Sequence, residues 1–149
     1  MAQLTEVRFH GRGGQGAKTA WYIRAVAAAE EGGNINAFPE YGAERRGAPM
    51  KSYVRISDEP IRIRSGVTSP DVVVVLDDTL LSTQNVTEGM EDTDILIVNT
   101  DQTPDEIRGQ LANPNVDLHV VDATQVAMDT IGRPIPNTPM LGAMAKTVD

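Results

Sequence analysis

Six residues near the start of the chain, Gly-Arg-Gly-Gly-Gln-Gly at positions 11–16, have the composition of a ligand-binding turn. They follow a segment with strand character at 6–10 and precede a helical segment that begins at Ala17. Glycine tolerates positive φ and carries no Cβ, so the backbone of such a turn can pass close to a ligand. The N–H groups at the start of the next helix then face the turn with a partial positive charge. This junction predicts a seat for an anion, most often a phosphate.

Three interpretations of this turn stay open. Gly11, Gly13 and Gly16 fit the dinucleotide pattern G-x-G-x-x-G, which also expects an acidic residue about 20 positions further on. Glu40 lies near that distance, although Pro39 would disturb the end of the strand before it. A P-loop would need its lysine directly after the last glycine, and here one residue intervenes. The third interpretation is a tight strand-to-helix connection without a ligand.

A second polar segment, residues 38–49, has neither helical nor strand periodicity and is predicted to be an ordered loop. Its adjacent Arg45 and Arg46 offer planar forks of donors that suit phosphate or carboxylate. In the alternative interpretation, Glu40 or Glu44 pairs with one of these arginines and fixes the loop. The two interpretations are compatible, because one arginine can be structural while the other faces a ligand.

Five motifs, at 6–16, 38–49, 54–61, 70–77 and 137–143, follow one another in an order and spacing that resemble a known family. They are similar to the gamma subunits of 2-oxoacid:ferredoxin oxidoreductases, the family of pyruvate synthase, and the resemblance covers nearly the whole chain. Members of that family usually continue for some tens of residues beyond the last motif. The chain is therefore expected to be a single gamma-subunit domain, residues 1–149, and two interpretations of its end stay open: it is a fragment, or the remainder lies elsewhere.

The resemblance implies a subunit of an enzyme that oxidises a 2-oxoacid with coenzyme A to an acyl-CoA and carbon dioxide while reducing ferredoxin. Thiamine diphosphate would belong to the alpha and beta subunits, and the iron–sulfur clusters to beta and delta. The gamma subunit would frame the coenzyme A path, with no catalytic residue and no cofactor bound by this chain alone. The expected contact residues are Gly11, Arg12, Gly13, Gly14, Gln15, Gly16, Glu40, Tyr41, Glu44, Arg45 and Arg46.

Composition narrows the classes of partner. The chain has 149 residues with 13 basic and 21 acidic side chains, and its net charge of −8 argues against nucleic acid and anionic membranes as general partners. There is no cysteine, hence no disulfide and no thiolate ligand for a cluster, and the two histidines show no metal-site spacing. No apolar run approaches the roughly 20 residues needed to span a bilayer. We expect a soluble, cytoplasmic protein.

Strands alternate with helices along the chain, which predicts an α/β fold with three layers, a mostly parallel Rossmann-like sheet and an inserted antiparallel hairpin. The predicted hairpin joins residues 50–57 to the alternating segment 61–64. The other predicted strands are 6–10, 35–38, 72–76, 95–98 and 118–121. Helices are predicted at 17–31, from 78 to 85, from 103 onward, at 123–131 and at 139–147.

Three polar residues, Asp77, Asn99 and Asp122, follow predicted parallel strands, where ligands of such sheets gather. The favoured interpretation is that they cap the helices that follow. His10 ends the first strand beside the glycine turn and is expected to be a strand-end histidine with its hydrogen bonds satisfied. His119 lies inside an apolar strand and is expected to contribute to packing.

On residues alone, the chain is an α/β domain that recognises phosphate, with its chemistry modest or supplied by a partner. Two other functions remain open beside the gamma-subunit role. The chain could be a stand-alone dinucleotide-binding enzyme, which would bind NAD or FAD when purified alone. It could instead be an assembly scaffold that contacts no ligand.

Overall fold

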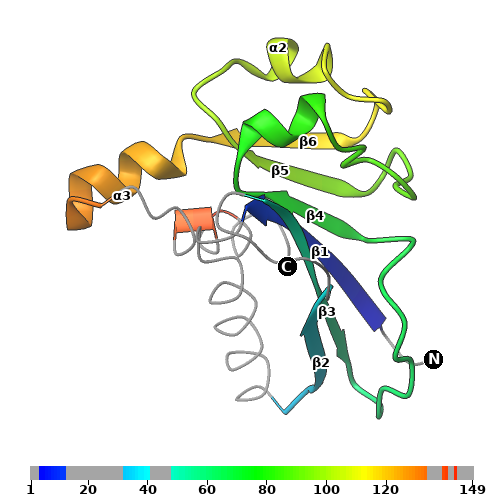
Figure 1. Cartoon of the computed structure of the whole chain (residues 1–149). Helices are drawn as coiled ribbons and strands as arrows, with labels where there is room; N and C mark the ends of the chain where they lie inside the picture. Colours follow the sequence, from blue (N-terminus) through cyan, green and yellow to red (C-terminus); the bar gives the residue numbers. More distant parts are fainter. Residues whose placement is uncertain (1–3, 13–31, 41–47, 134–138, 141–142, 144–149) are drawn as a thin grey trace.

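The computed structural model describes residues 4–12, 32–40, 48–133, 139–140 and 143. One mixed sheet holds six strands in the order β2-β3-β1-β4-β5-β6 (Figure 1). The strands are β1 Leu4–Arg12, β2 Asn34–Pro39, β3 Pro49–Ser57, β4 Val72–Val75, β5 Ile95–Asn99 and β6 Asp117–Val121. The predicted α/β class and the predicted strands at these positions are confirmed, and β1 continues two residues further than expected, through Arg12.

The parallel half of the sheet is apolar on both faces. β1 pairs with β4, β4 with β5 and β5 with β6, all in parallel. Val72 and Val74 pack into one core cluster, with Phe9 and Ile97, whereas Val73 and Val75 pack into a second. Because successive side chains of a strand point to opposite faces, the two clusters lie on opposite sides of the sheet. A run of four valines suits a strand that is covered on both faces.

The antiparallel half differs from the predicted hairpin. β3 pairs on one side with β1 and on the other with β2, so both of its edges are occupied. The prediction that residues 61–64 form the second strand of a hairpin is wrong, because no edge of β3 is left for them. They form no strand and lie in the connection between β3 and β4.

The described helices are short and begin where the local sequence predicted. The 3₁₀ helix η1 Asp78–Ser82 and α2 Pro104–Arg108 bring Leu81 and Ile107 onto the second core cluster. α3 Ala123–Ile131 ends at Gly132, whose φ of 69° is the left-handed conformation that glycine adopts easily. In Figure 1, η1 and α2 lie over the parallel half, while α3 projects away from it. The predicted helix at 17–31 and most of that at 139–147 lie outside the described residues.

Candidate functional site

The carboxyl ends of β1 and β4 mark the point where the connections of the sheet diverge. From β1 the chain continues to β2 and β3 on one side, whereas from β4 it continues to β5 and β6 on the other. Ligands of open α/β sheets bind in the crevice outside the carboxyl ends of the strands at such a switch point. The topology therefore directs attention to the side chains around the end of β1.

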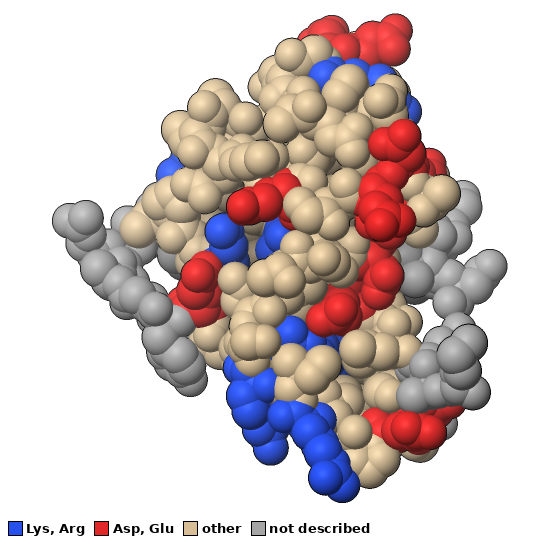
Figure 2. Space-filling model, turned by 90° about the vertical axis from the view of Figure 1, so that its right-hand side faces the viewer, with Lys and Arg blue, Asp and Glu red and all other residues tan. Residues whose placement is uncertain are grey.

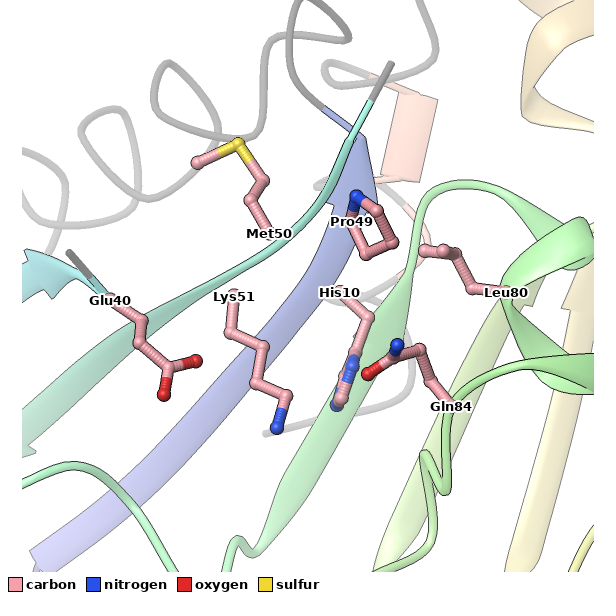
Figure 3. A pocket seen from close by; sticks show the side chains of 7 residues that line it. All are labelled: His10, Glu40, Pro49, Met50, Lys51, Leu80 and Gln84. Atoms are coloured by element: carbon pink, nitrogen blue, oxygen red, sulfur yellow. The ribbon is translucent and has the colours of Figure 1, made fainter. Parts of the chain in front are cut away.

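A cavity of about 180 Å³ lies at this point. Figure 3 shows the side chains of Glu40, Lys51 and His10 extending to the same side of the sheet, with the Gln84 side chain directed toward His10. They come from the end of β2, from β3, from β1 and from the segment after η1, so four separate parts of the chain meet here. The complete lining is His10, Glu40, Pro49, Met50, Lys51, Leu80 and Gln84. An imidazole, an ammonium, a carboxylate and an amide thus share one small cavity.

His10 has a fixed proton arrangement. Its side chain is buried, with the residue only 1% exposed, and Nε2 accepts a hydrogen bond of 2.8 Å from Nε of Arg8. Burial, followed by the positive charges of Arg8 and Lys51, lowers the pKa of His10 to about 3. The ring is therefore neutral at physiological pH, and because Nε2 accepts, the ring proton lies on Nδ1. His10, which lines the cavity, is thus a neutral imidazole with its proton on Nδ1.

Arg8 determines that arrangement, and sequence reasoning did not select it. Its guanidinium is buried, and Nη2 donates to the carbonyl oxygens of Val86 and Glu88, both at 2.9 Å. Burial lowers the pKa of Arg8. The guanidinium of an arginine stays protonated in proteins and has no acceptor atom. Arg8 can therefore only donate to His10. The alternation in β1 is the signal that could have indicated this site. It places Arg8 and His10 on one face of the strand and Val7 and Phe9 on the other.

Glu40 joins the cavity to the buried Tyr53. Its N–H donates to the Lys51 carbonyl oxygen at 2.9 Å, which extends the pairing of β2 and β3 by one residue. Burial raises the pKa of Tyr53, and the charge of Glu40 and its hydrogen bond from the phenol raise it further. The carboxylate is thus held by a tyrosine that stays protonated. Since β3 lies between β1 and β2, Glu40 does not close a strand adjacent to β1, as the acidic residue of a dinucleotide fold does.

Gly11 and Arg12 lie at the end of β1 rather than in a turn. They pair with Met50 and Pro49 of β3. The guanidinium of Arg12 reaches across to the segment after β4, where Nε lies 3.3 Å from Oδ2 of Asp77 and Nη2 donates to Oγ1 of Thr79 at 2.9 Å. Arg12 therefore ties the ends of β1 and β4 together beside the cavity.

Of the eleven predicted contact residues, the structure thus describes Gly11, Arg12 and Glu40 and brings them to one end of the sheet. The other eight lie outside the described residues: Gly13, Gly14, Gln15, Gly16, Tyr41, Glu44, Arg45 and Arg46. Their predicted role remains a prediction.

The polar residues at the strand ends are caps, and two of them, Asp77 and Asp122, cap the helices that follow them, as favoured from the sequence. Asp77 accepts from the Thr79 N–H and caps η1, and Asp122 accepts from the Gln125 N–H and caps α3. Asn99 accepts from two N–H groups at the start of α3 rather than from the helix that follows it in sequence. They stabilise helix ends and leave the cavity at β1 as the candidate site.

His119 differs from its expected packing role. Its side chain is 40% exposed on β6, an edge strand of the described sheet, and Nε2 lies 3.1 Å from Oδ1 of Asp117. Within the described part of the chain, no cluster of three or more His, Asp or Glu side chains could hold a metal ion. The helices in the same part are all too short or too polar to cross a bilayer.

The neutral His10 predicts a dependence of stability on pH. In the unfolded chain its pKa is near 6.5, whereas in the fold it is about 3, so between these values only the unfolded state binds the proton. The free energy of unfolding should therefore fall as the pH falls through this window, by about 1.4 kcal/mol per pH unit at most. Urea unfolding of the wild type and of His10→Gln at pH 6.5, 5.5 and 4.5 measures this. Equal pH slopes for the two proteins would contradict the buried neutral imidazole.

Comparison with known proteins identifies the family. Residues 6–149 match the family described as pyruvate ferredoxin/flavodoxin oxidoreductase. The chain is 52% identical over 143 residues to the pyruvate/ketoisovalerate oxidoreductases common subunit gamma of Thermococcus kodakarensis, covering 96% of this chain and 77% of that protein.

Solved structures agree with this match. The pyruvate oxidoreductase subunit PORC of Thermotoga maritima aligns with a TM-score of 0.88 and 48% identity, over 98% of this chain and 77% of that one. A keto/oxoacid ferredoxin oxidoreductase gamma subunit of Geobacter sulfurreducens aligns with a TM-score of 0.74 and 27% identity, over 97% and 77%. The resemblance noted in the sequence is confirmed, and the chain belongs to the pyruvate ferredoxin/flavodoxin oxidoreductase family as a gamma subunit.

Proposed function

We propose that this gamma subunit serves a cytoplasmic, heteromeric enzyme that oxidatively decarboxylates a 2-oxoacid such as pyruvate. One 2-oxoacid and one coenzyme A give an acyl-CoA and carbon dioxide, and the two electrons released reduce two ferredoxins. The names of the relatives, which include pyruvate and ketoisovalerate oxidoreductase subunits, support this reaction class. The alpha, beta and delta subunits are the proposed partners.

In this proposal the redox cofactors belong to those partners. Iron–sulfur clusters are held by cysteine thiolates, and this sequence contains no cysteine, so its residues do not fit a cluster. Thiamine diphosphate is likewise assigned to the alpha and beta subunits, following the family resemblance. What this chain contributes is the placement of a ligand, which is the usual division of labour in cofactor enzymes.

The ligand we propose for the switch-point cavity is coenzyme A, along one stretch of its path. The observation that carries this assignment is that the Lys51 ammonium and the neutral His10 line one cavity, together with Gln84 and Glu40, at the carboxyl end of β1. A cation and fixed N–H donors suit the phosphates and amide carbonyls of coenzyme A. Arg12, which lies beside the cavity and is paired with Asp77, and on sequence grounds Arg45 and Arg46, are the further cations that we propose along this path.

Substitutions in the reconstituted complex test this role. Lys51→Met removes the charge and retains the stem, and we expect it to raise KM for coenzyme A about tenfold, which is about 1.4 kcal/mol of lost binding. KM for the 2-oxoacid should change less than twofold. Arg45→Ala and Arg46→Ala should act in the same direction.

The control is Arg133→Ala, an exposed arginine beyond α3. Coenzyme A kinetics that match the control in all three variants would remove the proposed role and leave an assembly scaffold. Loss of the variants from the complex on gel filtration would assign the arginines to anchoring instead. A titration of the purified chain with NAD and FAD tests the stand-alone enzyme, for which binding is required.

A further inference from the structure

The connection between β3 and β4 exposes two arginines around an isoleucine. Arg62 and Arg64 are exposed, and Ile63, between them, is 45% exposed. Neither arginine forms an ion pair with any residue that the structure describes. Figure 2 shows Lys and Arg side chains gathered at the lower end of one face, the end at which Figure 1 draws this connection. The chain as a whole has a net charge of −8, so this group of cations contrasts with its overall negative charge.

The segment has the pattern of a strand without the pairing of one. Ile-Arg-Ile-Arg at 61–64 alternates, yet within the described residues the hydrogen bonds to residues 61–66 are two, both from side chains of the sheet. Nδ2 of Asn36 donates to the Ile63 carbonyl oxygen at 3.0 Å, and Nη2 of Arg55 donates to the Gly66 carbonyl oxygen at 3.0 Å. Within the described residues its other backbone groups form no hydrogen bond. They are free to pair with an extended segment of another chain.

An aromatic cavity of about 450 Å³ adjoins this segment. Its floor is the ring pair Phe38 and Tyr53, whose centroids are 5.4 Å apart, and Arg64 and Gly66 belong to its wall. The guanidinium of Arg55 lies 5.9 Å from the Phe38 ring centre and pairs with Glu6, so the Phe38 ring packs against an arginine that is itself held by an ion pair. A cavity of this size accepts one large apolar side chain.

We propose that this arginine–aromatic surface, made of Arg62, Ile63, Arg64 and the adjoining cavity, docks an acidic, extended segment of another subunit of the complex. The two guanidinium groups would pair with its carboxylates, and the cavity would take one apolar side chain beside Ile63. Charge complementarity indicates an acidic occupant, and the exposed isoleucine with an aromatic cavity indicates a polypeptide. This goes beyond the proposed function, because it concerns assembly rather than coenzyme A.

Binding of the gamma subunit to the immobilised assembly of the other subunits tests the proposal. Arg62→Glu and Arg64→Glu are each compared with Arg133→Glu, which changes the net charge equally at another exposed site. We expect each reversal to weaken binding at least tenfold relative to this control at about 50 mM salt, and the difference to shrink to about threefold at 500 mM. Unchanged circular dichroism and melting temperature would show that the variants fold.

Ile63→Ser should also weaken binding, with little dependence on salt, whereas Ile63→Val should bind normally. Affinities of all these variants within twofold of Arg133→Glu would overturn the proposal. Normal assembly combined with a raised KM for ferredoxin would also overturn it and assign the surface to the electron acceptor. Self-association of the isolated chain that Arg64→Glu abolishes would assign it to a second copy. The coenzyme A kinetics of Lys51→Met are independent of all these outcomes.

Discussion

Replacing Gly89 with alanine should destabilise the fold by about 2–5 kcal/mol. Gly89 has a φ of 79°, which costs an alanine about 1–2 kcal/mol, and a Cβ at this position would overlap the backbone carbonyl oxygen of Thr68. Backbone cannot rotate away as a flexible side chain can, so relieving the overlap adds a cost of about 1–3 kcal/mol. Urea unfolding of the purified chain measures the difference.

Gly132→Ala is the matched control for the backbone conformation alone. Gly132 has a φ of 69°, but nothing lies within 4 Å of the position its Cβ would take. We expect this variant to lose only about 1 kcal/mol. Equal losses in the two variants would show that the contact with Thr68 contributes nothing. Arg8 donates hydrogen bonds to the carbonyl oxygens of Val86 and Glu88, close to Gly89 in the chain, and also to His10. A backbone shift at Gly89 should therefore disturb the hydrogen bond to His10 as well.

Replacing Asn99 with leucine should cost about 3–5 kcal/mol. The buried amide makes four hydrogen bonds at the carboxyl end of β5. Nδ2 donates to the Leu76 carbonyl oxygen and to Oγ1 of Thr124, while Oδ1 accepts from the N–H groups of Ala123 and Thr124. Leucine has a similar volume but leaves these groups unpaired, and each unpaired buried group costs about 1–3 kcal/mol.

Asn99→Asp separates the two halves of this network. A carboxylate retains the acceptor for the first N–H groups of α3, where negative charge is favourable, but loses both donor bonds. We therefore expect a smaller loss than for Asn99→Leu, and the helical signal of α3 should persist in the aspartate variant. A leucine variant as stable as the wild type would contradict the cap.

The elements that the sequence predicted correctly are those decided by a few adjacent residues. The valine run of β4 predicted a strand that is buried on both faces, and its alternate valines pack into the two core clusters. Thr103 followed by Pro104 predicted the start of α2, where Thr103 Oγ1 accepts from the Glu106 N–H. Gly132 predicted the end of α3. In each of these places a short stretch of sequence suffices, because the competing conformations are excluded locally.

Strand order could not be predicted in the same way. The insertion of β3 between β1 and β2 depends on pairing between distant segments, and alternation in a segment does not say which edge it will join. Residues 61–64 alternate as well as β3 does, yet β1 and β2 already occupy both edges of β3. Periodicity predicted strand character for residues 61–64. It could not predict that no strand edge of β3 would be left for them to pair with.

The sequence indicated where the candidate site lies better than which residues form it. The sequence placed ligand binding at the end of the first strand, and the cavity lies there. It did not select Arg8, Lys51 or Tyr53, because alternating polar side chains usually face solvent. Arg8 and Tyr53 are buried instead, and the carbonyls that receive Arg8 lie far along the chain, at Val86 and Glu88. Burial of this kind depends on distant segments, which local patterns do not show.

The central position of β1 has a consequence for synthesis. This strand leaves the ribosome before either of its neighbours, since Phe9 pairs with Ser52 on one side and with Val74 on the other. Until β4 has emerged, the nascent chain carries Val7 and Phe9 without the cluster that buries them. Such long-range pairing is slow to form and leaves apolar surface exposed meanwhile. We therefore expect the nascent chain to expose apolar surface of β1 until the residues of β4 have been synthesised.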